Sequence, residues 1–254
     1  MPGALQLVGL PGLPEVKPGD DLAGMLLQGV EAAGLTLQGG DVIALAQKIV
    51  SKQEGRLVDL RTVTPGEAAL HYAQASGKEP ALVELILREG PEVVRCMPGV
   101  LIVRHRLGYV VANAGIDQSN VPSAEHMALL LPEDPDASAA RIRSELRART
   151  GLDIAVLIND SFGRAWRQGV CGACIGAAGL SALVDERGRP DRFGRPMRHT
   201  QIAIGDELAA AASLVMGQCD EGVPAVLIRG LEGRYLNSAP ASQLVRPLAE
   251  DLFR

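Results

Sequence analysis

Residues 154–164 read Ile154-Ala155-Val156-Leu157-Ile158-Asn159-Asp160-Ser161-Phe162-Gly163-Arg164, and this run indicates the fold class. An unbroken apolar segment is typical of a buried strand, and the small polar residues that follow are typical of a turn. A second run, Val110-Val111-Ala112-Asn113-Ala114-Gly115-Ile116-Asp117-Gln118-Ser119-Asn120, also places a carboxylate after an apolar segment. Open α/β sheets bind ligands at the carboxyl ends of their strands, so both runs predict a ligand site.

The carboxylates of the two runs belong to Asp117 and Asp160. Oxygen ligands held at separate, rigid strand ends suit a hard divalent cation. The alternative is that each aspartate simply closes a turn, which is the commoner role of this residue type. One run alone favours the turn. Because two runs share the pattern, both interpretations stay open on the residues alone.

Outward from these runs, the pattern alternates helices with strands, as in α/β proteins. A Thr-Pro-Gly-Glu sequence from Thr64 predicts that this threonine caps a helix. Helices are predicted over residues 21–33, 64–75, 80–87, 134–149 and 206–216. Strands are predicted at residues 41–46, 154–158 and 224–228, and an antiparallel pair at 100–103 and 109–111. We therefore expect an α/β fold with a mixed sheet.

The chain has 254 residues, no internal repeat and no clean linker. We therefore expect a single domain over residues 1–254, and a subdivision near residue 180 remains conceivable. Residues 9–20 are rich in Gly and Pro and predict a shaped loop. Residues 183–199 are polar and rich in Arg and Gly, so a long irregular segment or hairpin is expected there.

The formal net charge is −5 and aromatic residues make up 3% of the chain. Both values disfavour binding to nucleic acid, which needs positive charge and often aromatic rings. The apolar runs are too short to span a bilayer, and the N-terminus lacks a secretory signal pattern. We expect a cytoplasmic protein with neither a nucleic-acid nor a membrane partner.

The usual nucleotide signatures, the Walker A run and Gly-x-Gly-x-x-Gly after a strand, are absent. Lys48 and Lys52 follow the predicted strand at 41–46 and are candidates for neutralising a phosphate group. Taken alone, the pair is better interpreted as two solvated lysines at the start of a helix.

The four cysteines do not form a disulfide framework. Cys171 and Cys174 are spaced as Cys-x-x-Cys, but no further residues complete a zinc or redox pattern. Packing of small side chains in a tight strand is the favoured interpretation. Nearby, Arg164, Trp166 and Arg167 form a group that predicts either an anion site or a surface ion-pair cluster.

Several motifs occur in the order found in one known family, and they cover about residues 9–231. They are Gly12-Leu13-Pro14-Glu15-Val16-Lys17-Pro18-Gly19-Asp20-Asp21, Gln47-Lys48-Ile49-Val50-Ser51-Lys52-Gln53-Glu54-Gly55-Arg56, Asn113-Ala114-Gly115-Ile116-Asp117-Gln118-Ser119-Asn120, Leu129-Leu130-Leu131-Pro132-Glu133-Asp134-Pro135-Asp136, Asp160-Ser161-Phe162-Gly163-Arg164, Gly188-Arg189-Pro190-Asp191-Arg192-Phe193-Gly194-Arg195, Asp206-Glu207-Leu208-Ala209-Ala210 and Met216-Gly217-Gln218. In these motifs the chain resembles the coenzyme F420-0:L-glutamate ligases, the F420 gamma-glutamyl ligases.

The resemblance implies a GTP-dependent ligase that adds L-glutamate to coenzyme F420-0 through an acyl phosphate, then adds glutamate through a γ-linkage. It implies Mn²⁺ or Mg²⁺, with K⁺ as a further cation, a two-part architecture and an intertwined homodimer. By position, Asp117 and Asp160 match catalytic metal ligands, and Ser161 and Gln218 match ligands of a second metal. The positions that match GTP contacts are Leu13, Pro14, Glu15, Val16, Gln47, Lys48, Lys52, Asn120, Met216, Gly217, Gln218, Cys219, Asp220, Glu221, Gly222 and Val223.

Two departures qualify the resemblance. Gln218 stands where relatives carry Glu or Gln, so one negative charge is absent compared with the Glu form, and the second metal is expected to bind weakly. The pair Cys171 and Cys174 lies outside the family pattern. No flavin-reductase-like extension is expected at the C-terminus. The alternative functions are a metal-dependent phosphohydrolase, a related ligase for another carboxylate, and a nucleotide-binding protein that has lost catalysis.

Overall fold

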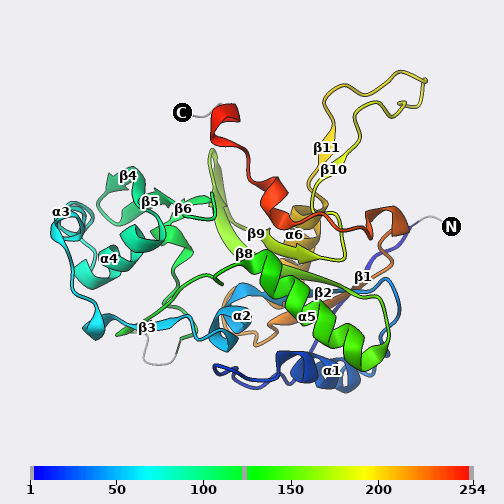
Figure 1. The fold of residues 1–254 in the computed structure, drawn as a ribbon, viewed down its shortest axis with the longest axis horizontal. Coiled ribbons are helices and arrows are strands. Elements are labelled where there is room, and N and C mark those ends of the chain that lie inside the picture. The colour runs from blue at the N-terminus through cyan, green and yellow to red at the C-terminus, as the bar shows by residue number, and fades with distance from the viewer. Residues whose placement is uncertain (1–2, 122–124, 252–254) are drawn as a thin grey trace.

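The computed structural model describes residues 3–121 and 125–251 as a larger α/β part and a smaller part at its side (Figure 1). The larger part contains a five-stranded sheet in the order β1-β12-β2-β8-β9. Its strands are β1 (Gln6–Gly9), β12 (Ala225–Arg229), β2 (Val42–Ala46), β8 (Ala155–Arg164) and β9 (Arg167–Ala178). Only β2 and β8 pair in parallel, so the sheet is mixed, as expected.

Helices cover both faces of this sheet because its central strands are apolar on both sides. Ile43 and Leu45 of β2 belong to a core shared with α1 (Leu22–Ala32) and α5 (Pro135–Thr150). Val42 and Ala44, which point the other way, pack in a second core with α6 (Ile204–Met216). Helix α2 (Gln47–Gln53) begins directly where β2 ends. The carboxyl end of β2 therefore opens into a turn beside β8.

The smaller part has its own apolar core, built mainly on α3 (Glu67–Ser76) and α4 (Pro80–Glu89). Its strands are β3 (Leu57–Asp59), β4 (Glu92–Met97), β5 (Val100–Arg104), β6 (Val110–Ala112) and β7 (Met127–Leu129). β4, β5 and β6 form one antiparallel sheet, and β3 pairs with β7. The architecture thus has the two parts that the resemblance implies.

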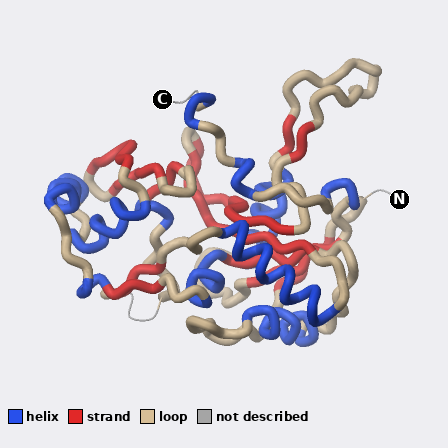
Figure 2. Tube along the Cα trace, in the orientation of Figure 1, coloured by secondary structure: helices blue, strands red, loops and turns tan. Residues whose placement is uncertain are grey.

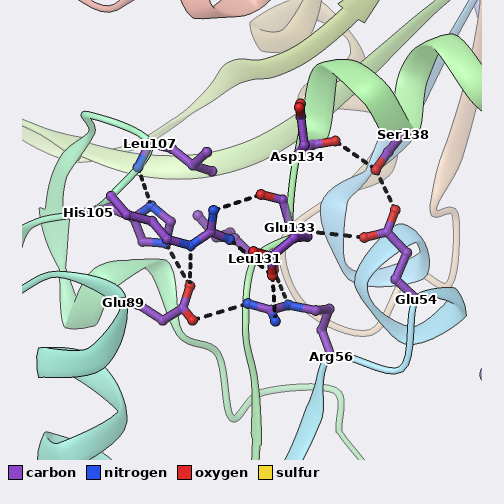
Figure 3. A network of polar contacts seen from close by, with 10 residues as sticks. Glu54, Arg56, Glu89, His105, Leu107, Leu131, Glu133, Asp134 and Ser138 are labelled. Carbon is purple, nitrogen blue, oxygen red and sulfur yellow. Dashed lines mark hydrogen bonds and ion pairs between the residues drawn. The ribbon is translucent and has the colours of Figure 1, made fainter.

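A polar network joins the two parts at the segment that leaves α2 (Figure 3). Arg56 donates to the backbone oxygen of Leu131 at 2.9 Å and pairs with Glu89 of α4 at 3.2 Å. Glu89 also accepts from His105, which is buried, and pairs with Arg106. On the other side, Glu54 accepts a hydrogen bond from Ser138 of α5. The ends of α2, α4 and α5 are therefore held by one set of charges.

The C-terminal third of the chain adds a hairpin that projects from the body, visible in tan above the sheet (Figure 2). Its strands are β10 (Val184–Asp185) and β11 (Gln201–Ile202), and the predicted polar segment forms the loop between them. The short helices η1 (Leu60–Thr62), η2 (Asn113–Gly115), η3 (Gly233–Tyr235), η4 (Ala241–Leu244) and η5 (Leu248–Glu250) complete the described elements. Within the described residues, no helix combines the length and apolarity that a membrane crossing requires.

The predicted helices and strands are present, but three details of the sequence interpretation are wrong. Thr64 does not cap α3: the N-cap is Gly66, whose N–H donates to Glu84 of α4 at 3.0 Å. β8 does not end before Asp160 but continues to Arg164, because β9 offers a backbone partner along that length. Asp117 does not follow directly after a strand: β6 ends at Ala112, close to the end predicted for that strand.

Candidate functional site

A cavity of about 410 Å³ opens at the carboxyl end of β2, where its parallel pairing with β8 ends. Ala46, Gln47 and Lys48 line it from the junction of β2 and α2, and Asp160 and Ser161 line it from β8. This is the place where open α/β sheets bind ligands, because loops from adjacent strands diverge there. We refer to it below as the first cavity.

Every position that the resemblance assigns to GTP lies on the wall of the first cavity. These residues are Leu13, Pro14, Glu15, Val16, Gln47, Lys48, Lys52, Asn120, Met216, Gly217, Gln218, Cys219, Asp220, Glu221, Gly222 and Val223. Four more residues line it that the sequence interpretation did not name as site residues, namely Ala46, Ile49, Asn159 and Pro224. Each is adjacent in the chain to a predicted residue or sits on the same turn, which is the only signal that points to it.

Lys52 ties two of the cavity's loops together. Its Nζ lies 2.6 Å from Oε1 of Glu15 and donates to the backbone oxygen of Asn120 at 3.0 Å. Asn120, at a φ of 53°, in turn donates from its side chain to the backbone oxygen of Cys219 at 2.9 Å. Three segments that are distant in sequence are thus fixed around one space.

The loop at residues 216–224 lines the cavity along its whole length. Gly217 has a φ of 74°, and a Cβ at this position would lie within 2.4 Å of the Glu221 carboxylate. That carboxylate accepts from the N–H of Cys219 at 2.8 Å. A side chain at Gly217 would therefore strain the backbone and displace Glu221.

Asp117 is not a wall residue of the first cavity, but it is joined to one that is. Its Oδ2 lies 2.7 Å from Nζ of Lys48, and its Oδ1 accepts from Oγ of Ser119 at 2.8 Å. Ser119 also accepts from Lys48 at 2.8 Å. Lys48 and Ser119 therefore fix the orientation of the Asp117 carboxylate, and the sequence interpretation gave Ser119 no role of its own.

Asp160 is the most electrostatically perturbed carboxyl group of the site. Burial raises the pKa of Asp160 to about 7, against the hydrogen bond from the backbone N–H of Ser161. The negative charge of Asp117 raises this pKa further, and the ammonium group of Lys48 lowers it. The two aspartates are therefore close enough to repel each other, a situation that a bound cation would relieve.

The sequence profile described as F420-0:Gamma-glutamyl ligase matches residues 12–230. The chain belongs to this ligase family. It is 45% identical to a protein of Methanothermobacter thermautotrophicus named "Coenzyme F420:L-glutamate ligase", over 98% of this chain and 99% of that protein. Proteins of the same name from Methanopyrus kandleri and Haloarcula marismortui are 45% and 40% identical, over 94% and 98% of this chain and 94% and 96% of those proteins.

In this ligase family member, the donors around Asp160 suit a hard cation. They are the carboxylates of Asp117 and Asp160, the hydroxyl of Ser161 and the amide oxygen of Gln218, all of them oxygen atoms. The described residues contain no group of three or more His, Cys, Asp and Glu side chains arranged to hold a metal. Asp117 is paired with Lys48, whereas no cationic side chain of the described residues forms an ion pair with Asp160. The two carboxylates therefore form only part of a coordination shell, which phosphate oxygens or water would complete.

Ser161 and Gln218 lie together, as ligands of one ion would. Oγ of Ser161 donates to Oε1 of Gln218 at 2.8 Å. Nε2 of Gln218 donates to Oγ of Ser213 on α6 at 2.8 Å, which directs the amide oxygen toward Ser161. The geometry brings the pair together, but this pair contributes no full negative charge.

The remaining sequence candidates lie apart from the first cavity. Arg164, Trp166 and Arg167 occupy the tip of the β8–β9 hairpin, where Trp166 is 89% exposed. Cys174 is buried in β9, as the packing interpretation expects, and Cys171 is half-buried. Neither cysteine forms a disulfide.

Proposed function

We propose that this chain is a GTP-dependent ligase that joins L-glutamate to F420-0 and then adds glutamate through a γ-linkage. The observation that carries the proposal is the first cavity. It gathers two lysines, several carboxyl groups and the loop at residues 216–224 where the parallel pairing of β2 and β8 ends. Membership of the ligase family and the names of the relatives support the acceptor and the amino acid.

The lysines supply the positive charge that a triphosphate requires. The Nζ atoms of Lys48 and Lys52 are held by Asp117 and Glu15, so both ammonium groups are positioned before a nucleotide binds. Because phosphate oxygens compete for these donors, nucleotide binding would weaken the pair between Lys48 and Asp117. The Asp117 carboxylate would then be available to a divalent cation.

Asp117 and Asp160 would hold Mn²⁺ or Mg²⁺, which when bound neutralises charge on the transferring phosphoryl group. Ser161 and Gln218 would contribute to a second ion. K⁺ remains a prediction for which no residues are assigned.

The two-step chemistry follows from the poor reactivity of a carboxylate toward amines. A carboxylate oxygen of F420-0 attacks the γ-phosphorus of GTP, the bond to the β-phosphate oxygen breaks, and GDP leaves. The glutamate nitrogen, as the free amine, then attacks the carbonyl carbon of the acyl phosphate. Phosphate departs with the C–O electron pair, the nitrogen loses a proton, and an amide remains.

Mass spectrometry of F420-0 incubated with the protein, GTP, Mn²⁺ and L-glutamate tests this proposal. Mass gains in glutamyl steps, absent when GTP or glutamate is omitted, are expected. GTP consumption that is independent of glutamate and F420-0 would instead indicate a phosphohydrolase. Binding of GTP without phosphate release in the complete mixture would indicate a protein that has lost catalysis.

We also propose that the chain acts as a homodimer. Light scattering coupled to size-exclusion chromatography tests this, and a monomeric mass at working concentration would contradict it.

A further inference from the structure

A second cavity, of about 270 Å³, lies between the β5–β6 hairpin, the β8–β9 hairpin, α6 and residues 244–251. This volume suits a ligand smaller than a nucleotide. Its lining includes Arg104, Tyr109, Phe162, Ala173, Asp206 and Arg246. The sequence interpretation assigned no ligand to any of them.

Asp206 supplies an unpaired acidic group to the second cavity. It is half-buried in the first turn of α6, and its Oδ1 accepts from the backbone N–H of Cys174 at 2.9 Å. No lysine, arginine or histidine pairs with Asp206 among the described residues, and its Oδ2 has no hydrogen-bond partner among them. A carboxylate in such a place favours a cationic ligand group.

Arg246 supplies a free positive charge at the exposed side of the same cavity. Within the part of the chain that the structure describes, no acidic side chain pairs with Arg246. Arg104, by contrast, is neutralised by Glu92 at 3.2 Å and by Asp251 at 3.4 Å. The second cavity thus has a carboxylate on its more buried wall and a guanidinium on its exposed rim.

Two aromatic rings form the wall beside these charges. The rings of Tyr109 and Phe162 lie 5.5 Å apart between centroids, and the Tyr109 hydroxyl donates to the backbone oxygen of Ile175 at 3.0 Å. The wall is therefore rigid and apolar, and it suits the methylene chain of a small ligand.

The second cavity adjoins the strand face that carries Asp160. Asp160 is paired in register with Ala173, which lines the second cavity. Phe162 follows Asp160 by two positions and so shares its face of β8. Burial raises the pKa of Tyr109, and the charges of Asp136, Cys174, Asp206 and Asp160 raise it further. Carboxylates of both cavities therefore affect the pKa of Tyr109.

We propose that the second cavity binds the amino-acid substrate, with its ammonium group on Asp206 and a carboxylate on Arg246. This inference rests on the proposed function and names the subsite of L-glutamate. Of the three substrates, GTP and the carboxylate acceptor are anions, and only the amino acid carries an ammonium group. Ala173 is paired with Asp160 and lines this cavity, so the amino acid would bind beside the strand pair that carries Asp160.

The test compares Asp206→Asn with Glu207→Gln, an exposed neighbour on the same helix that lines neither cavity. Asn keeps an oxygen that accepts from Cys174 and removes only the charge, so the fold is preserved. Loss of a charged hydrogen bond is expected to raise the KM for L-glutamate about tenfold or more, while the KM for GTP stays within about twofold. Arg246→Gln should raise the same KM, and E207Q should change neither.

Binding is measured separately, by saturation-transfer NMR with L-glutamate and with glutarate, which lacks the amine. The wild-type protein should bind glutamate more tightly than glutarate, and D206N should abolish this preference. If the wild-type protein makes no glutamyl product, the proposed function fails, and the NMR preference alone decides the subsite. A folded D206N protein with unchanged glutamate KM, or with an unchanged preference for glutamate, overturns the inference.

Discussion

Nζ of Lys48 lies 2.7 Å from Oδ2 of Asp117, so a lysine that lines the first cavity is paired with a carboxylate outside its wall. The pair is partly exposed on both sides, so the contact itself adds little to stability. Its importance is that it presents one positive and one negative group at the same point. In the proposed function, the nucleotide would use the ammonium group and its metal ion would use the carboxylate.

Asp117→Asn is expected to lower turnover by on the order of 1,000-fold, because the side chain keeps its shape and loses the charge that would hold a cation in the proposed function. Thermal unfolding should change little, since the residue is partly exposed. Asp153→Asn, at an exposed position before β8, is the matched control and should retain full activity. Wild-type turnover by D117N would contradict the assignment of Asp117.

Gln218→Glu is expected to tighten the second metal site about tenfold, because a full negative charge replaces an amide oxygen. The substitution is compatible with the neighbours, since the hydroxyl of Ser213 can donate where it now accepts. Titration with Mn²⁺, followed by electron paramagnetic resonance, should show a second ion bound at lower concentration. An unchanged titration would mean that residue 218 does not contact an ion.

Metal affinity should depend on pH through Asp160. With its pKa raised to about 7 by burial, the metal-free carboxyl group is protonated below that value, and a cation must displace the proton. The apparent Kd for Mn²⁺ should therefore rise as the pH falls below about 7 and level off above it. Calorimetric titrations at pH values from about 5.5 to about 8.5 would show this change in Kd, because the carboxyl group titrates over roughly that range. A Kd constant across the range would exclude Asp160 as a ligand.

Glu89→Gln is expected to destabilise the joint between the two parts of the fold. Burial opposes the charged form of Glu89, but the hydrogen bond from His105 and the charges of Arg56 and Arg106 outweigh it and lower the pKa to about 2. Because the folded pKa lies below the ordinary 4.5, this stabilisation is complete above that value and is lost as the pH falls toward 2.

Denaturant unfolding of E89Q at neutral pH should show a free energy of unfolding that is lower than that of the wild type by up to about 3 kcal/mol. The decrease is smaller where water screens the charges of the network. The difference in the free energy of unfolding between wild type and E89Q should narrow between about pH 5 and about pH 3, the interval over which protonation is linked to folding. Glu125→Gln, at an exposed position, should leave stability unchanged. A constant difference across this pH interval would rule out the charge of Glu89 as its cause.

Local patterns predicted the helices well where caps and apolar spacing agree. Asp134 and Pro135 begin α5, and Asp134 does accept from the N–H of Ala137. Strand ends were harder, because the extent of β8 depends on a partner strand and not on its own residues. The strands β1 and β4 were not predicted, since short or edge strands carry little pattern of their own.

The residues of the candidate site also divide into those that local sequence patterns predicted and those that they did not. Apolar runs and acidic residues singled out Asp117 and Asp160, whereas residues 216–223 came only from the resemblance to a family. Residues 216–223 match none of the catalytic or binding patterns that can be recognised from residue types and spacing alone. The second cavity was invisible to sequence, because Asp206 and Arg246 meet only after the C-terminal residues fold back across β9.

The position of β12 has a consequence for how the protein is made. This late strand lies between β1 and β2, so the sheet has an open slot until residues 225–229 leave the ribosome. Until then β1 has no neighbour and the apolar edge of β2 is uncovered, which invites association with other nascent chains. The edge of β2 therefore stays exposed from the synthesis of residues 42–46 until nearly the whole chain has been made.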